Sequence, residues 1–209
     1  MNHYSIIAHR GFWSTPDEKN SSIAFKRAFS KGYGVETDLR DLKGEIVISH
    51  NMPEGQEIKF EDLVKMLNGR PNTLALNIKA DGIYDSVFKI LNKYDVENYF
   101  TFDMSIPDLV CQTQYENVNV FTGMSDILNE PILLDRCTGV WLDSFYTDWY
   151  SEIEIESILS KNKKLCVVSP ELHGRQHIDV WKLIKPYIDE IYVCTDLPEA
   201  AEEYFYGKD

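Results

Sequence analysis

Short apolar, β-branched segments recur along the whole chain, and helical segments separate most of them. This alternation limits the fold more than any other feature, because strands that are linked through helices pair in parallel. We count EIVISH as a hairpin arm of the second strand, so eight strand–helix units remain, and these predict an α/β protein with a (β/α)8 (TIM) barrel. Nine segments have the strand pattern: YSIIAH, GVETDL, EIVISH, TLALNIK, YFTFDM, VNVFTG, GVWLDSF, KLCVVS and EIYVCTD.

A doubly wound open sheet is the alternative architecture for such a chain. It usually has fewer strands and often a glycine-rich first turn, which HRGFW is not. The 209 residues contain no linker, repeat or low-complexity tract. Residues 1–209 are therefore predicted to form a single domain.

The chain is acidic, with a formal charge of −13, which argues against nonspecific binding to nucleic acid or to an anionic membrane. No apolar run is long enough to predict a signal peptide or a membrane span. The four cysteines form no C-x-x-C pair, so we expect reduced core residues in a cytoplasmic protein. They are Cys111, Cys137, Cys166 and Cys194.

Two carboxylates stand one residue apart on the second predicted strand, in the segment VETDLR. Glu36 and Asp38 point to the same face of that strand because side chains alternate along it. Two close carboxylates repel each other unless a cation lies between them, and oxygen ligands suit Mg²⁺ or Ca²⁺. In a parallel barrel this face opens at the carboxyl ends of the strands, where function collects.

Other polar side chains end neighbouring strands. His9 and Arg10 end the first predicted strand, His50 ends the hairpin arm, and Asn77 and Lys79 end the third strand. Two histidines at one rim can share proton transfer, one as base and one as acid. The arginine and the lysine supply the positive charge that a phosphate needs. The set therefore predicts metal-assisted cleavage of a phosphodiester.

The motifs HRG, ETDLR and VISH resemble those of the glycerophosphodiester phosphodiesterase family, within the wider group of phospholipase-C-like phosphodiesterases. NIK and VCTDLPEAAEEYF are also similar, so the resemblance spans most of the chain, and several segments resemble a short bacterial branch. It implies a (β/α)8 barrel and matches Asn20 to the asparagine of the family's capping segment. It also implies a catalytic pair, two metal ligands and two phosphate-binding cations, namely His9 with His50, Glu36 with Asp38, and Arg10 with Lys79.

The chain departs from the family pattern at two positions. Asn77 stands where the family usually has a third metal-binding glutamate, and Asn51 stands where it has an aspartate after the second histidine. An amide oxygen can still bind a metal, but it brings no charge. Asp143 or Glu171, at the predicted ends of later strands, could fill the gap, and His173 is a further candidate beside them.

We expect divalent-metal-dependent hydrolysis of a small polar phosphodiester, such as a glycerophosphodiester or a phosphoryl-linked sugar. A phosphate-binding barrel without catalysis and a lyase that forms a cyclic phosphate remain open. Structural roles are also open: Glu36 and Asp38 can pair with Arg10 or Arg40, with Arg40 otherwise packing outside the barrel. The aromatic side chains near strand ends can wall a pocket or pack in the core; they are Trp13, Phe102, Trp141 and Phe145. The sequence does not predict an oligomeric state.

Overall fold

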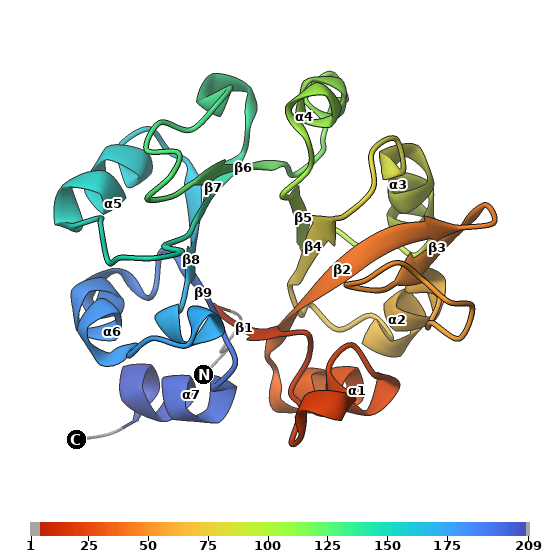
Figure 1. Cartoon of the computed structure of the whole chain (residues 1–209), viewed down its shortest axis with the longest axis horizontal. Helices are drawn as coiled ribbons and strands as arrows, with labels where there is room; N and C mark the ends of the chain where they lie inside the picture. The colour runs from red at the N-terminus through yellow and green to blue at the C-terminus, as the bar shows by residue number, and fades with distance from the viewer. Residues whose placement is uncertain (1–4, 208–209) are drawn as a thin grey trace.

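A computed structural model describes residues 5–207, and it is a barrel of parallel strands inside a ring of helices (Figure 1). The first residue of the predicted YSIIAH strand, Tyr4, lies outside this range. The strands pair in the order β5-β4-β2-β1-β9-β8-β7-β6. Their bounds are β1 Ile6–His9, β2 Gly34–Leu42, β3 Glu45–Ile48, β4 Leu74–Ile78, β5 Tyr99–Phe102, β6 Phe121–Met124, β7 Gly139–Leu142, β8 Lys164–Val168 and β9 Tyr192–Thr195.

The two end strands of this series meet, which closes the barrel. A parallel bridge joins Thr101 of β5 to Val120, next to β6, and the Thr101 N–H donates to the Asn119 carbonyl at 2.9 Å. β3 is antiparallel to β2, with Leu39 opposite Ile48, and it takes no other place in the strand order. Both the (β/α)8 barrel and the hairpin arm predicted from the sequence are confirmed.

The described residues form seven α-helices, which follow the strands around the ring in chain order (Figure 1). The first begins after Ser21, whose side chain accepts a hydrogen bond from the Ala24 N–H, so Ser21 is the cap and Asn20 is free for another role. Between β6 and β7 a 3₁₀ turn, Leu134–Arg136, replaces a helix. The helices are α1 Ser22–Lys31, α2 Phe60–Leu67, α3 Tyr84–Lys93, α4 Ile106–Gln112, α5 Glu152–Leu159, α6 Ile178–Ile184 and α7 Pro198–Tyr206.

Among the described residues, a hydrophobic cluster that contains four aromatic side chains fills the inside of the barrel. Phe102 stacks on Trp141 with 3.8 Å between ring centroids, and Phe100 stacks on Phe121 at 3.9 Å. Both Phe102 and Trp141 are therefore core residues. Cys166 and Cys194 belong to the same cluster and Cys137 is also buried, but Cys111 is exposed on α4, so the prediction for the cysteines is wrong there.

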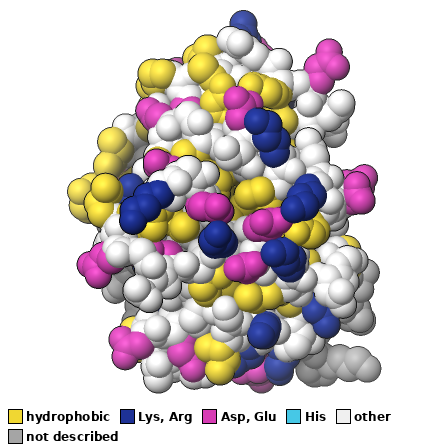
Figure 2. Space-filling view, turned by 90° about the vertical axis from the view of Figure 1, so that its right-hand side faces the viewer, with side chains coloured by type: hydrophobic (Ala, Val, Ile, Leu, Met, Phe, Trp, Pro, Cys, Tyr) yellow, Lys and Arg dark blue, Asp and Glu magenta, His cyan; other side chains and the backbone are white. Residues whose placement is uncertain are grey.

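The surface carries charges of both signs. Seen from the side of α3 and the β2–β3 hairpin, Lys and Arg side chains alternate with Asp and Glu (Figure 2). Ion pairs such as Lys93–Glu61, at 2.6 Å, link neighbouring helices. No helix in the described part of the chain is both long and apolar enough to cross a bilayer.

Candidate active site

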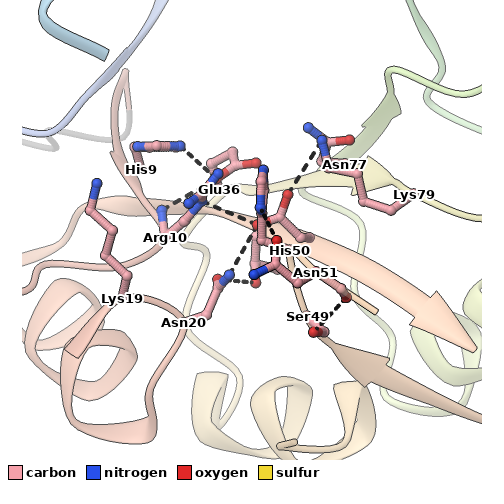
Figure 3. Close-up of polar contacts among 12 residues, drawn as sticks. His9, Arg10, Lys19, Asn20, Glu36, Ser49, His50, Asn51, Asn77 and Lys79 are labelled. Atoms are coloured by element: carbon pink, nitrogen blue, oxygen red, sulfur yellow. Dashed lines mark hydrogen bonds and ion pairs between the residues drawn. The ribbon is translucent and has the colours of Figure 1, made fainter. Parts of the chain in front are cut away.

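His9 lies at the carboxyl end of β1, directly opposite Glu36 of β2 in the strand register. Its Nδ1 is 2.7 Å from Asp196 Oδ1. Its Nε2 is 3.8 Å from Glu36 Oε2 (Figure 3). Because a carboxylate only accepts, Nδ1 carries the proton and Nε2 keeps a free lone pair. Burial lowers the pKa of His9, although the hydrogen bond and charge of Asp196 oppose the shift. A neutral imidazole of this kind can act as a base.

Asp196 follows β9 and holds His9 in place, a role that the sequence did not assign. Burial would raise its pKa, but the hydrogen bond and charge of His9, together with Lys19, lower it below the usual value. Lys19 Nζ lies 3.2 Å from Asp196 Oδ2 and 4.5 Å from the centroid of the Trp13 ring. Trp13 donates from Nε1 to the His9 carbonyl at 3.1 Å. The TD pair at the end of the last predicted strand was the available signal for Asp196.

Asp38 contacts both predicted phosphate-binding cations, and its side chain is 1 % exposed. Arg10 Nε lies 3.2 Å from Oδ2, and Lys79 Nζ lies 3.5 Å from Oδ1. The amide of Asn20 donates to Oδ2 at 3.0 Å, and Thr37 fixes this amide by donating to its oxygen at 2.8 Å. The structure thus brings Asp38 together with both predicted phosphate-binding cations and Asn20. Figure 3 labels Arg10, Lys79 and Asn20 around this point.

The backbone of the HRG motif explains why its residues occur together. Arg10 has a φ of 56°, which turns its N–H to Glu36 Oε2 at 3.2 Å. Gly11 follows with a φ of 87°, and a Cβ there would lie 2.8 Å from the Ala24 Cβ. Only glycine fits this left-handed position against α1. The glycine therefore lets the arginine turn back into the site.

Among residues 5–207, no Lys or Arg side chain forms an ion pair with Glu36, and the neutral His9 lies 3.8 Å away. Burial, and then the nearby Asp38 carboxylate, raise its pKa well above the usual value, while Arg10 and Lys79 oppose the shift. A buried carboxyl group of this kind either holds a proton or needs another cation. Arg10 and Lys79 therefore do not fully offset the cost of ionising both Glu36 and Asp38.

Asn77 of β4 stands directly opposite Asp38 in the strand register, so the two side chains point to the same side. Its Nδ2 donates to Asp103 Oδ2 at 3.1 Å. Its Oδ1, like Asp38 Oδ1, is buried and has no hydrogen-bond partner among the described residues. Neither oxygen accepts a hydrogen bond from the described part of the chain, although Lys79 Nζ lies 3.5 Å from Asp38 Oδ1, and oxygens of this kind suit a hard cation.

These oxygens allow a direct test of whether a divalent cation fits. Within residues 5–207 no group of three or more His, Cys, Asp or Glu side chains is arranged to hold a metal. The oxygens of Glu36 and Asp38 with Asn77 Oδ1 are a two-carboxylate, one-amide set, which suits Mg²⁺ or Ca²⁺. The residues therefore fit the predicted metal, with an uncharged oxygen where a third carboxylate was expected.

Asp103, which sequence reasoning missed, follows β5 in a left-handed conformation with a φ of 61°. The Asp103 side chain is exposed, but protein atoms of the barrel mouth crowd around its carboxyl group. The resulting desolvation raises its pKa to about 6. Asp143 adds to the rise, and Lys79 and the hydrogen bond from Asn77 oppose it. The available signal was its place near the end of the predicted strand segment YFTFDM, one position beyond the buried residues YFTF.

His50 is exposed, and its Nδ1 lies 3.1 Å from the amide oxygen of Asn51. It shares a cavity of about 460 Å³ with Arg10, Lys19 and Asn20. Arg40 does not pair with the carboxylates. Instead its guanidinium donates to the His50 carbonyl at 3.2 and 3.3 Å and to the Lys79 carbonyl at 3.1 Å, which ties the hairpin arm to β4.

The later candidates form separate contacts on the opposite side of the mouth. Asp143 follows β7, and its Oδ1 is 2.7 Å from Nε2 of His173, whose pKa this hydrogen bond raises. The Glu171 carboxylate accepts hydrogen bonds from the Ser169 and Thr195 hydroxyl groups and from the Asp196 N–H at 3.1 Å. The structure thus pairs Asp143 with His173 and joins Glu171 to the Asp196 segment; it does not place either beside Asn77.

Comparison with known proteins supports the architecture. No family model and no curated protein matches the sequence. The fold is similar to a putative glycerophosphoryl diester phosphodiesterase from Agrobacterium tumefaciens, with a TM-score of 0.73, 10 % identity, and 94 % of this chain and 95 % of that chain covered. An Oleispira antarctica phosphodiesterase in complex with the product sn-glycerol-3-phosphate gives 0.71, 13 % identity and 96 % of each chain.

A second group of solved structures is less similar. A tryptophan synthase α-subunit variant from Pyrococcus furiosus gives a TM-score of 0.58 at 14 % identity, over 98 % of each chain. At such identities a likeness shows the fold, which is the (β/α)8 barrel. The arguments about chemistry therefore depend on the residues at the mouth.

Proposed function

We propose that the protein belongs to the glycerophosphodiester phosphodiesterase family and is a divalent-metal-dependent phosphoric diester hydrolase. Its substrate is a small polar phosphodiester, such as a glycerophosphodiester or a phosphoryl-linked sugar. The observation that carries the proposal is that the His9–Asp196 pair and the Glu36–Asp38 pair meet Arg10 and Lys79 at one barrel mouth. The product sn-glycerol-3-phosphate in the Oleispira antarctica neighbour belongs to the same substrate class.

Arg10 and Lys79 bind the phosphate in this proposal. Both side chains are about a quarter exposed, at 22 % and 25 %, so each can reach a ligand while it contacts Asp38. Asp38, which the Asn20 amide holds in place, positions the two cations before substrate binds, and this lowers the entropy lost on binding. A divalent cation held by Glu36, Asp38 and Asn77 would supply further positive charge for the phosphoryl oxygens.

His9 takes the proton from the attacking oxygen, which is a water or a substrate hydroxyl. Its Nε2 has a free lone pair, and Asp196 stabilises the imidazolium that forms. His50 protonates the leaving alcohol from the cavity that it shares with Arg10. The hydrogen bond from His9 Nδ1 to Asp196 fixes the tautomer, so Nε2 is the nitrogen that accepts the proton.

The reducing cytoplasm is the compartment that we propose for the protein. All four cysteines are unpaired, and three of them are buried thiols in or beside the core. A disulfide-forming compartment gives no reason to keep four separate thiols.

Product analysis tests the reaction. The purified protein is incubated with glycerophosphodiesters and Mg²⁺ or Ca²⁺, and products are followed by phosphorus NMR. We expect a phosphomonoester and a free alcohol. A stable cyclic phosphate would identify the lyase reaction, and binding of glycerol phosphate without turnover would identify a phosphate-binding barrel; either result contradicts hydrolysis.

The Asn77→Glu variant tests the metal site. We expect it to bind Mg²⁺ or Ca²⁺ at least about tenfold more tightly than the natural chain, because a charged oxygen replaces a neutral one. Isothermal titration calorimetry measures the affinity directly, without any need for activity. Asn51→Glu is the matched control, since Asn51 contacts His50 and not the carboxylate pair. Equal affinities for all three proteins would contradict the assigned ligands.

The Asp196→Asn variant tests whether Asp196 positions the base. We expect kcat to fall by about 10²-fold or more while KM changes little, because an amide can stabilise the wrong tautomer and cannot balance the imidazolium. The Asp196 carboxylate raises the pKa of His9, so its loss should move the acidic limb of the kcat/KM profile to lower pH. A lower kcat with an unmoved limb would indicate a structural role only.

A further inference from the structure

Exposed apolar side chains gather at one end of the barrel. Eleven large hydrophobic side chains are exposed in the described part of the chain, and ten of them follow the carboxyl end of a strand. The eleventh, Tyr115, follows the end of a helix, α4, instead. The ten are Ile23, Met52, Ile106, Ile127, Leu128, Phe145, Tyr146, Ile153, Ile178 and Leu197. Apolar surface is therefore concentrated at the end that carries the candidate active site.

Four of these side chains come from two neighbouring loops, after β6 and after β7, and we call them the apolar rim. Ile127 and Tyr146 are the most exposed, at 65 % and 74 %. Leu128 and Phe145 complete the set. β6 and β7 are paired, with Met124 opposite Leu142, so the two loops leave adjacent strand ends. Exposed apolar side chains that gather on adjacent loops commonly mark a binding site.

Hydrogen bonds hold both loops in place. The Asp126 carboxylate accepts from the backbone N–H groups of Phe145, Tyr146 and Thr147, at 2.9, 2.8 and 3.2 Å. Ser125 Oγ accepts from the N–H groups of Ile127 and Leu128, each at 3.2 Å. A carboxylate from one loop thus fixes the backbone of the other. The apolar side chains are presented to water by an ordered backbone.

The apolar rim continues into the barrel mouth. The Phe145 ring meets His173 edge to face, with 5.2 Å between centroids, and His173 is bonded to Asp143 at 2.7 Å. Asp103 follows β5, which lies between β4 on the cation side and the β6 segment on the apolar side, and its Oδ2 accepts a hydrogen bond from Asn77 Nδ2 at 3.1 Å. One side of the mouth therefore offers cations from β1 and β4, and the other offers apolar side chains.

We infer that the apolar rim binds an apolar group on one ester arm of the substrate, while the phosphate lies against Arg10 and Lys79. This narrows the proposed small phosphodiester to one in which one ester alcohol is polar and the other is an alkyl or aryl alcohol. This inference rests on the proposed function, because it uses the phosphate position that the function assigns. A single amphiphile fits better than an anionic bilayer, since the chain has a net charge of −13.

The test compares two phosphomonoesters that differ only in chain length. Isothermal titration calorimetry measures the affinity of the protein for ethyl phosphate and for hexyl phosphate, below the concentration at which the latter forms micelles. Four added methylene groups, about half buried, should make hexyl phosphate bind about tenfold more tightly. In the Ile127→Ser, Tyr146→Ser double variant, this preference should fall to about twofold or less.

Ile153→Ser is the matched control, because Ile153 is as exposed as Tyr146 at 74 % but lies on α5, outside the two loops. It should keep the preference for the longer chain. Equal affinities for the two probes in the natural protein, or an equal loss of preference in the control, would overturn the inference. So would a dimer, detected by light scattering, that the double variant dissociates, because the rim would then be a contact between copies.

Turnover of glycerophosphodiesters is measured in parallel and separates this inference from the proposed function. Chain-length preference without turnover would support the apolar rim and contradict the phosphodiesterase. Turnover without chain-length preference would support the enzyme and contradict the apolar rim.

Discussion

Replacement of His9 by alanine is expected to lower kcat/KM for phosphodiester cleavage by about 10³-fold, within the range that general acid–base catalysis contributes. His9 is the imidazole at the mouth whose Nδ1 is fixed by Asp196 and whose Nε2 remains free to accept a proton beside Glu36. The two neighbouring carboxyl groups replace that function poorly, since the pKa of Asp196 is lowered and Glu36 is buried. The assay follows release of the phosphomonoester under saturating metal.

The matched control is His177→Ala. His177 packs against Trp181, with 4.1 Å between ring centroids, at the start of α6. It should keep nearly full activity, even if it unfolds at a slightly lower temperature. Far-ultraviolet circular dichroism should show that His9→Ala remains folded. Activity of His9→Ala within about tenfold of the natural protein would remove His9 from the proposed mechanism.

The barrel could be predicted from the sequence because its signals are local. Each strand is a short apolar run, and each helix has its own apolar spacing, so neither needs information from distant residues. Closure was harder to predict, since β5 and β6 meet through the single bridge at Thr101. Eight units made closure the natural expectation, because strands at both open edges would otherwise lack partners.

The candidate site could be predicted in part, and the limit has a physical cause. Glu36 and Asp38 were recognised because strand periodicity alone puts them on one face, and register then brings Asn77 beside Asp38. Asp196 was missed because its contact with His9 spans 187 residues and depends on β1 pairing with β9. Asp103 was missed because its position depends on the left-handed turn after β5.

The two carboxylates of the site should affect stability in opposite directions, although both are buried on the same strand. Glu36→Gln is expected to stabilise the metal-free protein at pH 7.5, because burial and Asp38 raise the pKa of Glu36 well above its unfolded value near 4.5. The native carboxyl group therefore costs stability as pH rises above that value, and glutamine removes the cost. Each pKa unit of the shift corresponds to about 1.4 kcal/mol, so a Tm increase of at least about 2–4 °C is expected.

Asp38→Asn is expected to destabilise the protein by about 2 kcal/mol, since it leaves Arg10 and Lys79 without their shared carboxylate. The cost is below that of a fully buried pair because both cations can reach water. Thermal unfolding in EDTA at pH 7.5 and pH 4 tests the contrast. The gain from Glu36→Gln should shrink at pH 4, where the unfolded chain also holds the Glu36 proton. Both variants should lose activity by about 10²-fold or more. A lower Tm for Glu36→Gln at pH 7.5 would mean that the Glu36 carboxylate is stabilised in the native protein, and that the pair needs no added cation.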